Sequence, residues 1–230
     1  MILTPIPDDR LPLALDHFAA MLDDEAARRV FRRLANPQQA IRADGKAARE
    51  HHAAALRILL DLGLKTRSGA PVDGLSWDGQ AVRCETEAYV LLHEGAHFQL
   101  AAPERRHRPD FGLGPGPETG DRATAERAAC LFGLAREQEE ARASLLGILW
   151  EAELGQPALA SFLDQNWLEG AGRRGTAAHF INVLAALRAG GFIAADGRPT
   201  RRLRQGPDRV PPQDNALCGP AKWIWTARQR

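Results

Sequence analysis

The stretch 89–101, YVLLHEGAHFQLA, constrains the fold most strongly, because it places two histidines and a glutamate inside an apolar run. His93, Glu94 and His97 form the pattern H-E-x-x-H. The apolar periodicity predicts a helix from about residue 86 to residue 101. Residues four apart on a helix lie about 40° apart around its axis, so both imidazoles share one face. We therefore expect a buried helix whose two histidines point inward.

A metal site accounts for this pattern better than chance does. With seven histidines in 230 residues, the expected number of accidental H-E-x-x-H matches is on the order of 0.01. Two buried imidazoles need partners, and one metal ion satisfies both. The alternative is a core helix whose histidines hydrogen-bond to backbone or carboxylate groups. Glu94 flanks the pair, where a catalytic base for a metal-bound water would sit. The remaining histidines, for which surface or core roles are expected, are His17, His51, His52, His107 and His179.

Two histidines leave a metal short of a third protein ligand, which is commonly a carboxylate from another element. The candidates lie on the helical pattern of residues 123–154. Glu137 and Glu140 are three apart and share a face with small residues that would allow close approach to the histidine helix. We expect one of these two to be the ligand, and Glu126 and Glu139 to be solvated charges.

Two reaction classes use two histidines and one carboxylate. Zinc, with Glu94 as the base, activates water for amide hydrolysis, as in metallopeptidases. Iron(II) in a facial arrangement of the same ligands leaves positions open for dioxygen. The spacing of the ligands does not choose between the two.

Three segments together resemble the elongation factor P hydroxylase family. They are HEGAHF at residues 93–98, DFG thirteen positions after the second histidine at residues 110–112, and EQEEARASLLGILWEAELG at residues 137–155. That family has an H-E-x-x-H segment, a D-F-G segment at the same distance, and a later helix with two glutamates three apart. The resemblance covers about residues 81–155.

The resemblance implies a non-haem iron monooxygenase that hydroxylates a modified lysine of elongation factor P. It places Fe(2+) on His93, His97 and Glu140, with Glu137 orienting a ligand. Glu94 would manage a proton or hold a water. Zn(2+) in the same ligands, serving a metallopeptidase or other hydrolase, is the alternative.

Composition limits the partners and the compartment. Thirty basic against 29 acidic residues give a net charge of +1, so no overall field favours nucleic acid or a membrane. Three dispersed cysteines favour neither a disulfide framework nor a cysteine zinc site. No apolar run has the length of a signal peptide or a membrane span, so we expect a cytoplasmic, soluble protein with a protein substrate. A third alternative is a binding module that contacts a partner through Trp223 and Trp225.

The organisation along the chain predicts a predominantly helical α+β fold in one metal-dependent enzyme domain, residues 1–230. In it the H-E-x-x-H helix packs on the glutamate-bearing helix as a zincin-like core. Residues 1–65 form an N-terminal helical part, and residues 196–230, with eight basic and three acidic residues, a basic extension. Predicted helices span residues 12–35, 46–64, 86–101, 123–154 (with a break near Gly147) and 176–189. Irregular or strand-forming segments are 66–85 with a short strand at 81–84, the loop 102–121, and a hairpin at 191–203 that turns at Asp196 and Gly197.

Overall fold

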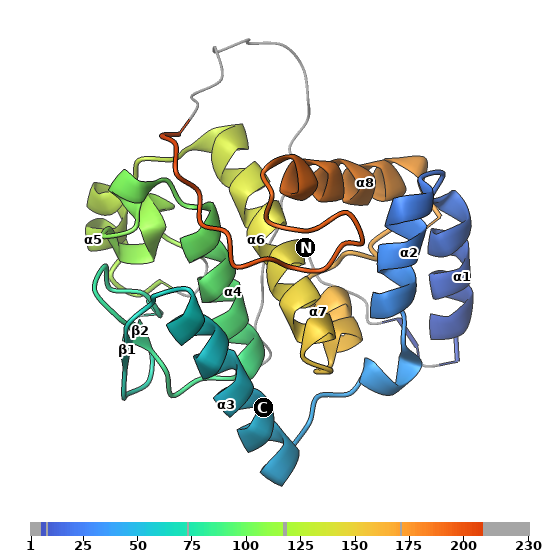
Figure 1. The fold of residues 1–230 in the computed structure, drawn as a ribbon, viewed down its shortest axis with the longest axis horizontal. Helices are drawn as coiled ribbons and strands as arrows, with labels where there is room; N and C mark the ends of the chain where they lie inside the picture. The colour runs from blue at the N-terminus through green and yellow to red at the C-terminus, as the bar shows by residue number, and fades with distance from the viewer. Residues whose placement is uncertain (1–5, 8, 73, 117–118, 171, 209–230) are drawn as a thin grey trace.

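The computed structural model describes residues 6–7, 9–72, 74–116, 119–170 and 172–208. Within these ranges the chain forms eight α-helices and one two-stranded sheet, which confirms a predominantly helical α+β fold (Figure 1). The helices are α1 (Leu11–Met21), α2 (Glu25–Leu34), α3 (Gly45–Asp61), α4 (Ala88–Leu100), α5 (Arg122–Ala128), α6 (Gly133–Glu153), α7 (Ala158–Asp164) and α8 (Arg174–Ala189). Short 3₁₀ turns are η1 (Pro37–Gln39), η2 (Pro103–Arg105) and η3 (Pro109–Gly112). The strands are β1 (Thr66–Arg67) and β2 (Val82–Arg83).

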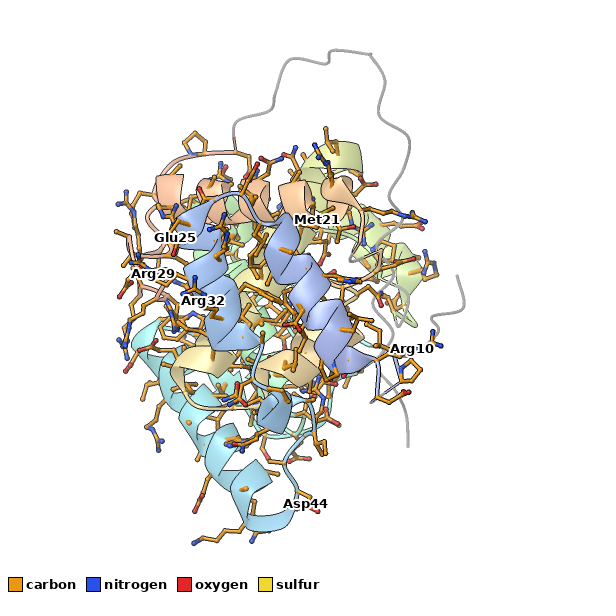
Figure 2. All side chains as sticks on the ribbon, turned by 90° about the vertical axis from the view of Figure 1, so that its right-hand side faces the viewer. Arg10, Met21, Glu25, Arg29, Arg32 and Asp44 are labelled. Atoms are coloured by element: carbon orange, nitrogen blue, oxygen red, sulfur yellow. The ribbon has the colours of Figure 1, made fainter. Side chains whose placement is uncertain are left out.

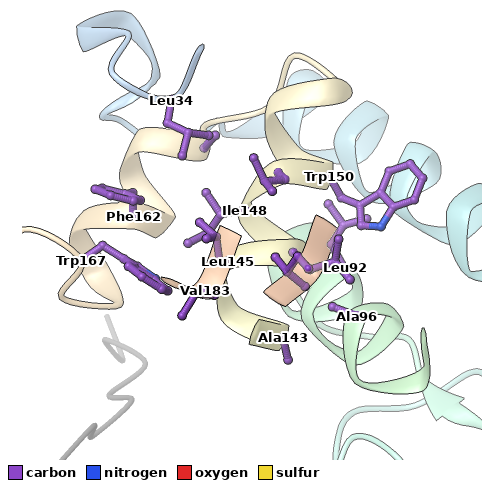
Figure 3. Packing of buried hydrophobic residues seen from close by; sticks show 14 of the residues in the cluster. Leu34, Leu92, Ala96, Ala143, Leu145, Ile148, Trp150, Phe162, Trp167 and Val183 are labelled. Carbon is purple, nitrogen blue, oxygen red and sulfur yellow. The ribbon is translucent and has the colours of Figure 1, made fainter. Parts of the chain in front are cut away.

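Helix α6 forms the centre of the fold. It contacts α4 on one side and α2, α7 and α8 on the other. Leu145, Leu146 and Leu149 are fully buried along it, and Leu92 of α4 packs against this core (Figure 3). Burial of each such side chain contributes about 1.5–3 kcal/mol. The apolar contact between α4 and α6 therefore fixes the frame on which the histidines and glutamates are carried.

The N-terminal part forms two helices rather than the single predicted helix over residues 12–35. Helix α1 ends at Met21, and the Asp24 side chain accepts a hydrogen bond of 2.6 Å from the backbone N–H of Ala27, which caps the start of α2. Figure 2 shows the two helices side by side, with Met21 and Glu25 at their junction. The prediction was wrong because a capping aspartate gives the chain an alternative to continuing the helix.

These two helices close an aromatic part of the core. The rings of Phe18, Phe31, Phe162 and Phe180 lie with centroids 4.8–6.3 Å apart, mostly edge to face. Such pairs contribute about 0.5–1.5 kcal/mol beyond their buried area. The N-terminal helices thereby pack on α7 and α8, away from the histidine helix.

The predicted long helix over residues 123–154 is broken, but not at Gly147. Asp121 caps α5 by accepting a hydrogen bond of 3.0 Å from the N–H of Thr124, and α6 begins at Gly133, whose φ is +54°. Gly147 lies inside an unbroken α6. A Cβ atom there would lie 3.2 Å from the Cα of His93, so glycine at this position serves close helix packing.

The remaining elements are short. The predicted strand at 81–84 corresponds to β2, which pairs in parallel with β1. The predicted hairpin after α8 does turn at Asp196 and Gly197, but it holds only a single bridge between Ile193 and Pro199. Helix α7 was not predicted.

The segment that follows α8 runs across α4 and α6 (Figure 1). The Gln99 side chain of α4 donates to the carbonyls of Thr200 and Arg202 at 2.7 and 3.0 Å, which ties this segment down. Of the predicted basic extension, residues 209–230 lie outside the described residues, and so do Trp223 and Trp225. No helix within the described ranges is long and apolar enough to cross a membrane.

Candidate metal centre

Helices α4 and α6 bring the three predicted ligands together. His93 and His97 are one turn apart on α4, and Glu140 faces them from α6. The close approach of α4 to Gly147 holds the two helices in contact at this level. On the opposite side of α4, a Cβ atom on Gly95 would be in ordinary van der Waals contact with the side chains of Leu62 and Leu59, at 3.5 and 3.8 Å, so the end of α3 packs behind the motif. Both faces of the histidine helix are thereby fixed.

The three side chains have the spacing of a mononuclear metal site. The Nε2 atoms of His93 and His97 are 3.0 Å apart, and Oε2 of Glu140 lies 3.4 Å from His97 and 4.0 Å from His93. Two ligand atoms that each lie about 2.1 Å from one ion, at an angle of about 90–110°, are roughly 3.0–3.4 Å apart. Two of the three distances match this range directly, and a small rotation of the Glu140 side chain brings in the third. Within the described residues, these three form a group of potential ligands whose atoms all lie within 4.8 Å of one another.

The protonation of the two histidines is strongly asymmetric without an ion. Burial lowers the pKa of His93 to about 3, helped by the charge of His97. Burial also disfavours charge on His97, but the carboxylate of Glu140 and its hydrogen bond outweigh this and raise the pKa of His97 to about 9. For Glu140, burial opposes ionisation, yet the charge of His97 lowers its pKa to about 2. Without a metal, the proton on His97 therefore supplies the positive charge that a bound cation would supply beside Glu140.

Glu94 faces the same cavity as the ligands without joining them. Its side chain is nearly buried, and its Oε2 atom has no hydrogen-bond partner among the described residues. Burial raises the pKa of Glu94 to about 7, against the opposing charge of His97. A carboxyl group with a pKa near neutrality and a free oxygen can accept and return a proton.

The cavity in front of the ligands has a volume of about 620 Å³. Glu137, which was predicted to orient a ligand, lines it, and that role stays a prediction. Arg122 and Arg136 also line it, each donating to a backbone carbonyl of the loop at residues 115–116. The wall formed by Gln165, Asn166 and Trp167 was not predicted, because it comes from the connection after α7, which carries no local motif.

A layer of aromatic side chains backs the histidines. The ring of Phe111 stacks on His97 at 5.8 Å and on Trp77 at 5.3 Å, and Phe98 packs edge to face against Phe111. Asp110, the residue before Phe111, lines the cavity itself. Burial, reinforced by the charge of Glu94, raises the pKa of Asp110 to about 8. The sequence motif at residues 110–112 thus lies beside the predicted ligands.

One of the predicted solvated glutamates is buried. Glu139 is 4% exposed and pairs with the guanidinium of Arg105, which is itself 2% exposed. The prediction for Glu139 was wrong because its charged partner comes from the 3₁₀ turn η2, 34 residues earlier, a contact that no local pattern reveals. Glu126 is exposed, as predicted.

The remaining histidines lie outside this cluster. His17 and His107 are exposed, and Nε2 of His52 lies 2.6 Å from the carbonyl oxygen of Cys84. Cys84 and Cys130 are free thiols, and Cys218 lies outside the described residues.

Comparison with known proteins found no family model, no curated protein and no solved structure that matches the chain. The likeness to the elongation factor P hydroxylase family therefore rests on the three motif segments alone.

Proposed function

We propose that this chain is a metal-dependent enzyme, a non-haem iron monooxygenase that hydroxylates a side chain of another protein. The observation that carries the proposal is the cluster of His93, His97 and Glu140, whose spacing fits one divalent ion. Iron(II) held by these ligands would supply the activation of dioxygen, with one oxygen atom entering a C–H bond of the substrate and the other leaving as water, reduced by two electrons from an external reductant. The zincin-like packing of α4 on α6 is part of the same proposal.

The other residues of the cavity have roles that follow from their placement. Glu94 holds or moves a proton at its unpartnered Oε2 atom. The aromatic layer of Trp77, Phe98 and Phe111 excludes water from the rear of the centre and keeps the ring of His97 in place. Glu137 and Arg136 stand at the cavity wall, where they meet polar parts of a substrate.

The proposed substrate is a modified lysine of elongation factor P. Two observations support a side chain as substrate. The cavity is large enough for a long side chain, and its lining mixes carboxyl and guanidinium groups with apolar ones. The choice of this particular protein rests on the resemblance of the three motif segments.

A zinc-dependent hydrolase is the second candidate, and the environment of Glu94 favours it. A carboxyl group beside the ligands, with a pKa near 7 and an unpartnered oxygen, suits the base that activates a zinc-bound water. The same three ligands would hold the zinc.

One experiment separates the two candidates. The iron(II)-loaded protein is incubated under ¹⁸O₂ with elongation factor P that carries the modified lysine without a hydroxyl group, with ascorbate as the reductant, and peptides of the factor are analysed by mass spectrometry. The monooxygenase predicts one ¹⁸O atom on a lysine-bearing peptide, absent with the His93→Ala variant. Peptide cleavage that requires zinc and is lost in Glu94→Gln, without oxygen incorporation, would refute the monooxygenase.

A further inference from the structure

Two consecutive residues beside the metal centre adopt the left-handed backbone conformation. Asp110 has φ +48° and ψ +35°, and Phe111 has φ +51° and ψ +21°. Residues other than glycine enter this region at a steric cost, and they normally do so singly. Backbone strain of this kind persists only where surrounding contacts impose it, and it gathers at functional sites.

The strained turn is held by buried polar contacts. The Arg105 guanidinium donates to the carbonyl oxygen of Phe111 at 2.6 Å, and it is itself fixed by the carboxylates of Glu139 and Asp208. The N–H of Asp110 donates to the carbonyl of Trp77 at 3.1 Å. The turn is therefore imposed by an ion-pair network that reaches from α6 to the segment after α8.

The effect of the turn is to aim one side chain into the cavity and another away from it. Phe111 is fully buried against His97 and Trp77, whereas the Asp110 side chain lines the cavity. Glu94, whose Oε2 atom has no partner among the described residues, lines the same space. With Glu137, the cavity thus holds three carboxyl groups that are not ligands in the proposed centre.

We propose that Asp110 is a substrate-contacting residue, whose carboxyl group hydrogen-bonds the substrate group that faces the metal, and that the left-handed turn is retained for this contact. This inference rests on the proposed function, because it places the substrate next to an ion on His93, His97 and Glu140. It assigns the D-F-G segment two tasks: Asp110 meets the substrate, and Phe111 supports a ligand.

Three substitutions separate a functional role of Asp110 from a structural one. Asp110→Gly removes both the carboxyl group and the steric cost of the left-handed conformation. Asp110→Ala removes the carboxyl group but keeps the steric cost. Asp110→Asn keeps the shape, an acceptor oxygen and the tolerance of the left-handed region, but it loses the negative charge that a bound cation favours on the carboxyl group.

The test uses the full chain loaded with Co(II), whose visible absorption reports ligands at the metal. Acetohydroxamate is the probe, because it chelates a metal and presents an N–H group to neighbouring acceptors. Its dissociation constant and the melting temperature are measured for the wild type and the three variants. Cobalt stoichiometry is determined first in each case.

The proposal expects one cobalt per chain in all four proteins. Probe binding should be about tenfold weaker in Asp110→Gly and Asp110→Ala, the effect of losing one hydrogen bond to a charged group, and weakened by less in Asp110→Asn, which keeps a neutral acceptor oxygen. It also expects the melting temperature to rise by roughly 2–4 °C in Asp110→Gly, but not in Asp110→Ala. Unchanged probe binding, or a melting temperature that falls in Asp110→Gly, would overturn the role of Asp110 while leaving the metal centre standing. A wild-type chain that binds no cobalt would overturn the proposed function and this inference together.

Discussion

Metal binding should expel a proton from the cluster, and the amount follows from the positions of the histidines. Without an ion, the Nε2 atoms of His93 and His97 share one proton across 3.0 Å, and the carboxylate of Glu140 stabilises it. An ion at this position needs the lone pairs of both nitrogens, so the proton must leave. The experiment therefore adds Zn(II) or Co(II) to the metal-free protein and measures the protons released.

The number of protons released per ion distinguishes this cluster from two histidines with ordinary pKa values. Because the pKa of His97 is raised to about 9, about one proton leaves per ion at pH 7.5. Two histidines with an ordinary pKa near 6.5 would together release only about 0.2 proton at that pH. Glu94 and Asp110, whose pKa values are raised to about 7 and about 8, add to the release when a cation arrives.

The assay is isothermal titration of the ion into metal-free protein at pH 7.5, in buffers of different ionisation enthalpy, which yields the number of protons released. The Glu94→Gln, Asp110→Asn double variant removes the two added contributions and leaves that of His97. About one proton is expected from this variant, and the apparent affinity should rise about tenfold per pH unit up to pH 9. A release below about 0.3 proton, or an affinity that is flat between pH 6 and 8, would exclude a protonated His97 in the metal-free cluster.

Three further predictions concern packing and buried charge. Gly147→Ala gains about 1 kcal/mol of helix propensity but loses about 1–3 kcal/mol to overpacking against the His93 backbone. The variant should therefore unfold at a lower temperature and bind the metal more weakly than the wild type. Gly175→Ala is the matched control, since no atom lies within 4 Å of a Cβ there. Arg105→Met leaves the buried carboxylate of Glu139 without its ion-pair partner, whereas Asp208 keeps Arg204, and should cost about 3–5 kcal/mol in denaturant unfolding. Glu151 is 2% exposed, and burial raises its pKa to about 8. The stability that its neutral form contributes is therefore lost as the pH rises from about 4.5 through 8. Glu151→Gln should melt at a higher temperature than the wild type at pH 9, but not at pH 5.

The outcomes that would contradict these predictions are equally definite. Equal behaviour of the two glycine variants would mean that α4 and α6 do not need their close contact. A loss below about 1 kcal/mol in Arg105→Met would show that its partners reach solvent without it. The same difference in melting temperature at pH 5 and pH 9 would exclude a buried neutral carboxyl group at Glu151.

The metal centre was predictable where it depends on local periodicity. Spacing along α4 alone puts His93 and His97 on one face, and the three-residue interval placed Glu137 and Glu140 together on the cavity side of α6. The prediction failed for Glu139, one position away, because its environment depends on Arg105 from a distant loop.

The rest of the fold depends on contacts that no window of sequence contains. The low helix propensity of Gly147 predicted a break in the helix. In the structure α6 is continuous there, and the missing side chain allows the close approach of α4. Asp24 ended one helix and began another through a single capping bond. The left-handed conformation of Asp110 has no local signal, since the contacts of Trp77 and Arg105 impose it.

If His93, His97 and Glu140 together hold one metal ion, the metal retained per chain depends on each of these side chains. The metal-free protein and its His97→Ala and Glu140→Ala variants are loaded with iron(II) without oxygen, desalted, and analysed for metal per chain. One ion per chain is expected in the wild type, and a loss of retained metal in both variants. Equal metal content in all three proteins, or none in the wild type, would contradict a metal site on these side chains.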